Sequence, residues 1–197
     1  MTASPPDRDY PSLFETGVSD YFRDFGHRSA RERPNQAWLL MSVARHIPAR
    51  NLVAELQVSR RDLRPFAELG DKNSAVNFDF AVSRSEINLR QWKTQSNDQK
   101  GEIETVTQTQ KTLQEIAVLA ELKMGDSAKT REITEDFKKM AGAIGFLISK
   151  NHKQLPRCYF ILFDPARKIN MDRVVKIASA EWPDTAPFPK ILIGPDV

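Results

Sequence analysis

Cysteine is nearly absent from this chain of 197 residues, with Cys158 as its single example. One cysteine excludes a disulfide within the chain and a cysteine-rich zinc site. Cys158 lies in an apolar stretch, where a thiol is seldom ionised, so we expect it to be buried and structural. A lone reduced thiol suits a reducing compartment, and we expect the protein to be cytoplasmic.

Long apolar runs are also missing, because no stretch approaches the ~18–20 residues that a membrane helix needs. The first residues lack a basic start followed by an apolar segment, so they do not resemble a signal peptide. Residues 1–11 are polar and carry Pro5, Pro6 and Pro11. We therefore expect a flexible N-terminal tail followed by one domain over 12–197, without a membrane partner.

Several enzyme signatures are absent. The three histidines, His27, His46 and His152, are far apart and have no metal-ligand spacing. The sequence contains no glycine-rich phosphate loop and no serine between glycines at a strand-to-helix turn. These gaps disfavour zinc proteases, P-loop nucleotide hydrolases and serine hydrolases.

The composition is that of a soluble globular protein, with 40% hydrophobic and 28% charged residues. There are 29 basic and 26 acidic residues, a net charge of +3. A mildly basic chain permits a nucleic-acid partner without requiring one.

Apolar periodicity predicts the order of elements. Helical spacing is found over Leu13–Phe25, Ala37–Ile47, Thr105–Glu115, Thr130–Ser149 and Asn170–Glu181. Strands are predicted over Asn51–Ser59, Val76–Val82, Ile116–Met124, Arg157–Asp164 and Lys190–Ile193. Residues 84–103 are polar and read as a loop or insertion. This order predicts an α/β domain with a mixed central sheet flanked by helices.

Charged residues at the end of one apolar strand are the most informative feature. Side chains alternate along a strand, so Glu121 and Lys123 share a face while Leu122 lies on the other. Asp79 has a similar setting between Phe78 and Phe80. Burying charges is costly unless they are paired or bind a metal, so these residues are candidates for chemistry.

If the two strands are neighbours, Asp79 and Glu121 can share one divalent cation. Mg²⁺ prefers oxygen ligands and takes one or two carboxylates together with water and phosphate oxygens. A nearby lysine can orient water or offset negative charge in a phosphodiester transition state. We therefore predict that Asp79, Glu121 and Lys123 form a Mg²⁺-dependent (or Mn²⁺-dependent) catalytic cluster.

An aspartate in one strand followed by Glu-x-Lys at the end of the next resembles the PD-(D/E)XK nuclease superfamily. The matching segments are 78–82 and 119–123, followed by a helix and a further strand, so that the resemblance covers about 52–164 with an insertion at about 84–115. The motif's proline is replaced by Phe78. The resemblance implies a restriction-endonuclease-like fold and hydrolysis of nucleic acid, with DNA as the expected substrate. Many small members of the superfamily pair, so a homodimer is also expected.

The resemblance also suggests secondary candidates. Glu55 is a candidate third metal ligand, with a solvent-facing strand residue as the equal alternative. Lys138 is a candidate phosphate contact. Asp136 can border the site, but we expect it to face solvent. In the polar insertion, Arg90, Trp92 and Lys93 are candidate nucleic-acid contacts, because Trp92 stands between two cations.

Two other hypotheses remain open. The chain can be a nuclease-like domain that binds nucleic acid or a protein partner without cutting. Alternatively, Glu121 and Lys123 can form a surface ion pair on an edge strand, which contributes only about 0–1 kcal/mol. In that last case Asp79 would lie far from Glu121.

Overall fold

The computed structural model describes residues 8–26, 32–69, 75–86, 109–125, 130–164 and 168–194. Five strands of this part of the chain form one mixed sheet in the order β1-β2-β3-β4-β5. The strands are β1 (Leu52–Ser59), β2 (Ala75–Ser83), β3 (Ile116–Met124), β4 (Arg157–Phe163) and β5 (Lys190–Gly194). The predicted α/β class with a mixed sheet between helices is confirmed.

The sheet has an antiparallel half and a parallel half. β1 pairs antiparallel with β2, and β2 pairs antiparallel with β3. β3 runs parallel to β4, and β4 runs parallel to β5. The long helix between β3 and β4, and the helix between β4 and β5, make the two crossovers that parallel pairing requires.

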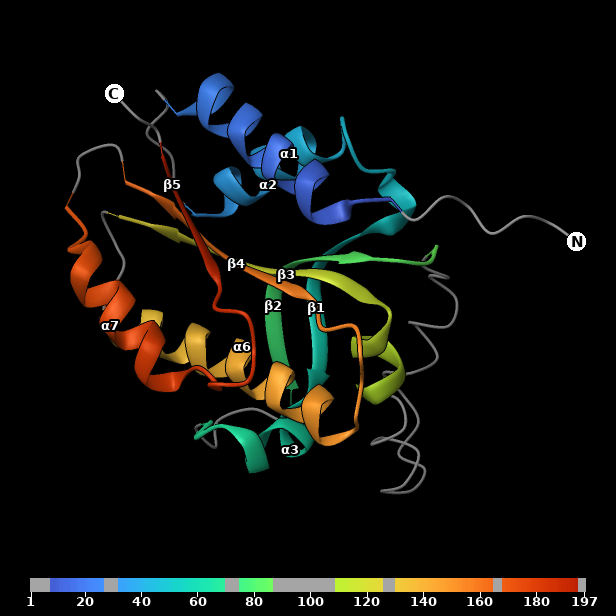
Figure 1. Cartoon of the computed structure of the whole chain (residues 1–197). Helices are drawn as coiled ribbons and strands as arrows, with labels where there is room; N and C mark the ends of the chain where they lie inside the picture. The colour runs from blue at the N-terminus through green and yellow to red at the C-terminus, as the bar shows by residue number, and fades with distance from the viewer. Residues whose placement is uncertain are drawn as a thin grey trace, which may run out of the picture.

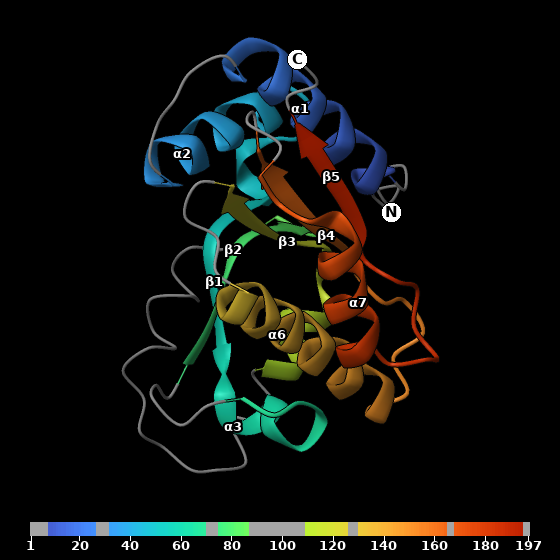
Figure 2. The ribbon, with the colours of Figure 1, turned by 90° about the vertical axis from the view of Figure 1, so that its left-hand side faces the viewer.

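Helices cover both faces of the sheet (Figures 1 and 2). The α-helices are α1 (Tyr10–Phe25), α2 (Glu32–Val43), α3 (Arg60–Leu63), α6 (Thr130–Ser149) and α7 (Met171–Glu181). Short 3₁₀ turns η1 (Ala49–Asn51) and η2 (Arg64–Phe66) flank β1 and α3, and residues 109–114 form a helical segment before β3. None of the helices in the described ranges is long and apolar enough to cross a membrane.

Two hydrophobic cores follow from this layering. One core lies between the sheet and α6 and α7, and includes Phe137 and Phe160. The other lies between the sheet and α1 and α2, and includes Phe14 and Tyr159. Cys158 is buried in the α6 core as predicted, and burial raises the pKa of its thiol.

Some boundaries differ from the sequence prediction. α1 begins at Tyr10, within the predicted tail, because the Asp9 carboxylate accepts a hydrogen bond from Ser12 N (3.2 Å) and caps the helix. α2 begins at Glu32 and ends at Val43, earlier than the predicted Ala37–Ile47, and turns replace its predicted end. Proline fits the first turn of a helix, so Pro34 is compatible with the earlier start.

Candidate active site

β2 separates from β3 at Asp79. The two strands pair from Ser83 to Phe80, and continuing the same register would place Asp79 opposite Glu121. Instead of continuing the backbone ladder, the Asp79 side chain accepts a hydrogen bond from Leu122 N (Oδ2, 2.9 Å). Its other oxygen, Oδ1, accepts one from Gln36 Nε2 (3.1 Å), which reaches over from α2. The carboxylate is therefore held from two directions at the backbone of β3, next to Glu121.

Near Asp79, the alternation of side chains between the two faces of the sheet is interrupted in both β1 and β2. Phe78 packs in the α6 core but Phe80 packs in the α1 core, although residues two apart share a face in a regular strand. On β1, Glu55 stands opposite Asp79 and has a left-handed backbone, with φ of 57°. This conformation interrupts the side-chain alternation, so Leu52 and Leu56 lie in different cores, although residues four apart share a face in a regular strand.

Glu121 and Lys123 lie on the α6 side of β3. Their alternate neighbour Leu119 belongs to the α6 core, while Ala120 and Leu122 belong to the α1 core. Glu121 is only 1% exposed, and Lys123 has a side chain that is 13% exposed. The prediction that these two charged side chains share a face of an inner strand is confirmed.

Two residues of α6 complete a buried charge network. Lys139 Nζ lies 2.9 Å from Glu121 Oε1 and 2.7 Å from Asp136 Oδ1, and it donates a hydrogen bond to Asn77 O (3.0 Å). Lys123 Nζ lies 2.9 Å from Asp136 Oδ2. Asp136 thus holds both ammonium groups, and Lys139 is surrounded by three oxygen atoms from three elements.

The network holds an unequal number of charges, with carboxylates at Asp79, Glu121 and Asp136 and ammonium groups at Lys123 and Lys139. Burial, then the charge of Asp136 and also that of Asp79, raises the pKa of Glu121 well above its usual range, against the opposing effect of Lys139. Burial alone would lower the pKa of Lys139, but the carboxylates of Glu121 and Asp136 outweigh it and raise that pKa. With all five groups ionised, the site has one surplus negative charge, and the raised pKa of Glu121 reflects it.

This surplus fits a divalent cation. Glu121 Oε2 is buried and has no hydrogen-bond donor among the described residues. No three His, Cys, Asp or Glu side chains of the described ranges stand close enough to hold a metal by themselves. Mg²⁺ needs only one or two carboxylates when water and phosphate oxygens supply the rest. Glu121 and Asp79 are suited to that role.

The structure places the predicted residues on neighbouring strands. Asp79 bonds the backbone of β3 at Leu122, and Glu121 is buried with Lys123 on an inner strand, which contradicts the hypothesis of a surface ion pair on an edge strand. Asp136 was expected to face solvent, and this was wrong, because it is 5% exposed and bonded to both lysines. Close packing of α6 over β3 buries it.

The remaining predicted residues are not joined to this network by any contact within the described ranges. Glu55 is exposed, and no hydrogen bond or ion pair within the described ranges joins it to Asp79 or Glu121. Lys138 Nζ lies 3.7 Å from Glu68 Oε2, on a different side of α6 from Lys139. Arg90, Trp92 and Lys93 fall outside the described residues.

Lys139 and Gln36 were not singled out from the sequence. A signal for Lys139 was present, because Asp136 and Lys139 are three apart and adjoin the apolar positions of a long helix. Gln36 has no such signal, since its contact with Asp79 joins residues 43 positions apart on different elements.

Comparison of the chain with protein-family models, with curated proteins and with solved structures gave no match.

Proposed function

We propose that this protein is a metal-dependent nuclease with a restriction-endonuclease-like fold of the PD-(D/E)XK type. The observation that supports the proposal is the bond from Leu122 N to Asp79, which fixes this carboxylate at the backbone next to Glu121, with Lys123 on the same face as Glu121. The element order supports it, because α6 follows Glu-x-Lys, covers the face that bears Glu121, and leads into the parallel strand β4.

Asp79 and Glu121 would hold Mg²⁺ or Mn²⁺ in this proposal. When bound, the cation polarises the phosphodiester and stabilises the charge that develops on its oxygens. Lys123, oriented by Asp136, would position the attacking water or donate to the scissile phosphate. Lys139 would restrain Glu121 and lower the charge that an incoming phosphate meets.

DNA is the proposed substrate, as the family resemblance suggests, and homodimer formation would place two such sites on the two strands. Specificity would then come from surfaces outside the charge network.

A second candidate is a nuclease-like domain that binds nucleic acid without cutting it. The observation that favours it is the pairing of both lysines with carboxylates, which leaves the network nearly neutralised without a metal. The two candidates differ in one measurable property, because only the first needs the cation for product formation.

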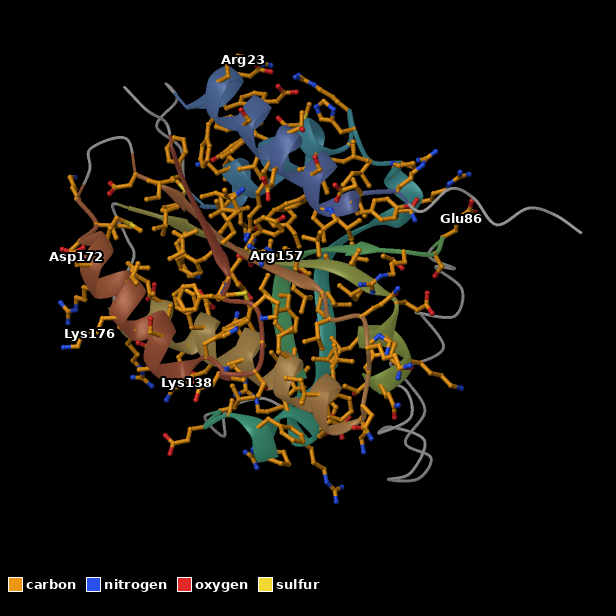
Figure 3. The ribbon with its side chains drawn as sticks, viewed as in Figure 1. Arg23, Glu86, Lys138, Arg157, Asp172 and Lys176 are labelled. Atoms are coloured by element: carbon orange, nitrogen blue, oxygen red, sulfur yellow. The ribbon has the colours of Figure 1, made fainter. Side chains whose placement is uncertain are left out.

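The test compares cleavage of single-stranded and double-stranded DNA and RNA in Mg²⁺, Mn²⁺ or EDTA. Wild type should cut DNA only with the cation, and Asp79→Asn, Glu121→Gln and Lys123→Met should each cut at least about 100-fold more slowly. The matched control is Asp172→Asn, which removes an exposed carboxylate at the start of α7, a helix that contributes no residue to the network; Figure 3 labels Asp172.

Binding of the same oligonucleotides is measured in parallel. Binding by wild type without cutting under any metal condition would replace the nuclease proposal by the binding candidate. Cleavage that is equal in wild type and the three site variants would place the chemistry elsewhere.

A further inference from the structure

A cavity of about 580 Å³ opens at the end of the sheet where β3 and β4 begin. Its walls come from the residues just before and within the start of α1, from the end of β2, from the loop after α6 and from the first residue of β4. A volume of this size lies within the ~300–1,000 Å³ typical of small-ligand sites.

The cavity is separate from the charge network. Its β3 residue is Ala117, which belongs to the α1 core, whereas Glu121 faces α6. Four residues along a strand also span about 13 Å. A ligand in this cavity would therefore not contact the network through β3, and the inference does not depend on the proposed nuclease activity.

The lining is strongly basic. It includes Arg8, Arg84, Lys153 and Arg157, against one carboxylate, Asp9. The Asp9 carboxylate caps α1 by accepting a hydrogen bond from Ser12 N, so it interacts with the N-terminus of the helix.

Neighbouring groups hold two of these arginines in place. The charge of Arg157 acts on Glu15 and on the Tyr159 side chain, and the Glu15 carboxylate is also paired with Lys190 at 2.6 Å. Arg84 Nη1 donates to the backbone carbonyls of Gln114 (3.1 Å) and Ile116. Its guanidinium is thus held in place at the cavity wall.

Recognition would come from these side chains and not from the start of α1. Tyr10 N donates to Arg8 O (2.8 Å), Pro11 has no N–H, and Ser12 N donates to Asp9. The first backbone donors of the helix are therefore used or missing, and cationic side chains are the groups left to hold an anion.

We propose that this cavity binds the phosphate group of a nucleotide-sized ligand. Two or more guanidinium groups beside an ammonium form a recurrent phosphate-binding chemistry, because arginine donates paired hydrogen bonds to phosphate oxygens and lysine adds a point charge. The phosphate can belong to a free nucleotide or to the end of a nucleic-acid strand, and both carry the same recognised group.

The experiment measures binding of inorganic phosphate, AMP, adenosine, and a single-stranded DNA 10-mer with and without a 5′-phosphate, in EDTA and low salt. The variants are Lys153→Glu, a change at an exposed loop residue, and Arg157→Gln. The matched control is Lys176→Glu, exposed on α7 and remote from Arg157 (Figure 3).

We expect AMP to bind at least tenfold more tightly than adenosine, with a tenfold loss in each cavity variant and no loss in Lys176→Glu. A ligand preference for the 5′-phosphorylated 10-mer over AMP, with the same loss in the variants, would identify a strand end as the source of the phosphate. Glu121→Gln should bind like wild type, which separates this site from the nuclease proposal.

Two results would overturn the proposal. One is the absence of binding by every phosphate-bearing probe at millimolar concentration to wild type whose circular dichroism shows a folded protein. The other is equal weakening by Lys153→Glu and Lys176→Glu, which would indicate nonspecific attraction to net charge.

Discussion

At the residue scale, the free-energy cost of burying the Glu121 carboxylate is the most informative property of the site. This carboxyl is buried beside two other carboxylates, and one oxygen has no donor among the described residues. A buried charge of this kind opposes folding unless a cation compensates it. Selection for stability alone would not favour it, which is the physical reason to regard it as functional.

Replacing Glu121 with glutamine should stabilise the metal-free protein at neutral pH by about 1–4 kcal/mol. The substitution removes the surplus charge, and Lys139 keeps its partners Asp136 and Asn77 O, so no cation is left unpaired. Urea unfolding in EDTA at pH 8 measures the difference. A variant that is less stable than wild type would show that the Glu121–Lys139 pair contributes net stability.

The same pair of proteins should differ in pH dependence. The folded-state pKa of Glu121 is raised above its usual 4.5, so the folded state binds this proton more tightly than the unfolded state. Stability of wild type relative to Glu121→Gln should therefore fall as pH rises above about 4.5, and level off above the folded-state pKa. A relative stability that is constant from pH 4 to 8 would contradict this.

At the scale of elements, the interrupted side-chain alternation in β1 and β2 coincides with the separation of β2 from β3 at Asp79. Glu55 adopts a conformation that costs a non-glycine residue about 1–2 kcal/mol, and it stands opposite Asp79, where β2 leaves β3. The strain and the strand separation occur together. Asp79 would otherwise continue an ordinary ladder and would not be available to bond Leu122 N.

Glu55→Gly should leave the free energy of unfolding unchanged or raise it by up to about 1 kcal/mol, because glycine adopts positive φ readily. The matched control is Gln57→Gly, two residues along the same exposed edge, which should lose about 0.5–1 kcal/mol. Chemical denaturation of both variants gives the comparison. Equal losses in the two variants would show that Glu55 is not strained in solution.

Glu55→Asn tests the predicted metal role separately from the backbone. Asparagine tolerates the left-handed conformation but lacks the carboxylate. If Glu55 ligates the cation, Mg²⁺ affinity measured by calorimetry should fall while stability is retained. Unchanged affinity would assign Glu55 a backbone role only.

At the scale of the whole molecule, contacts between α1 and β5 hold the layer of α1 and α2 onto the sheet. Figure 2 shows α1 lying along β5. Lys190 Nζ pairs with Glu15 at 2.6 Å, and Gly194 lies directly against the ring of Phe22. These contacts join the two ends of the described chain, and Gln36, which restrains Asp79, belongs to the same layer.

Gly194→Ala should destabilise the protein by about 1–3 kcal/mol, because the added Cβ would stand 2.3 Å from the Phe22 ring. Thermal unfolding measures the loss. Ile193→Ala, a change at an exposed neighbour, is the control and should lose clearly less. Similar losses in both variants would indicate that Phe22 moves aside without cost.

Local sequence patterns determined the order of helices and strands and the shared face of Glu121 and Lys123, because alternation and helical spacing are properties of consecutive residues. The family resemblance implied that the strands of Asp79 and Glu121 are neighbours, which the pairing of β2 with β3 confirms. The left-handed backbone at Glu55 carries no comparable signal, because the residues around it alternate as in a regular strand.

Only the tertiary structure decided which charges meet. The burial of Asp136, the contact of Lys139 with Glu121 and the bond from Gln36 to Asp79 depend on how α6 and α2 lie over the sheet. These contacts join elements far apart in sequence, and packing of the two cores fixes their geometry. A sequence pattern lists the charged side chains, whereas the distances between them follow from the docking of whole elements.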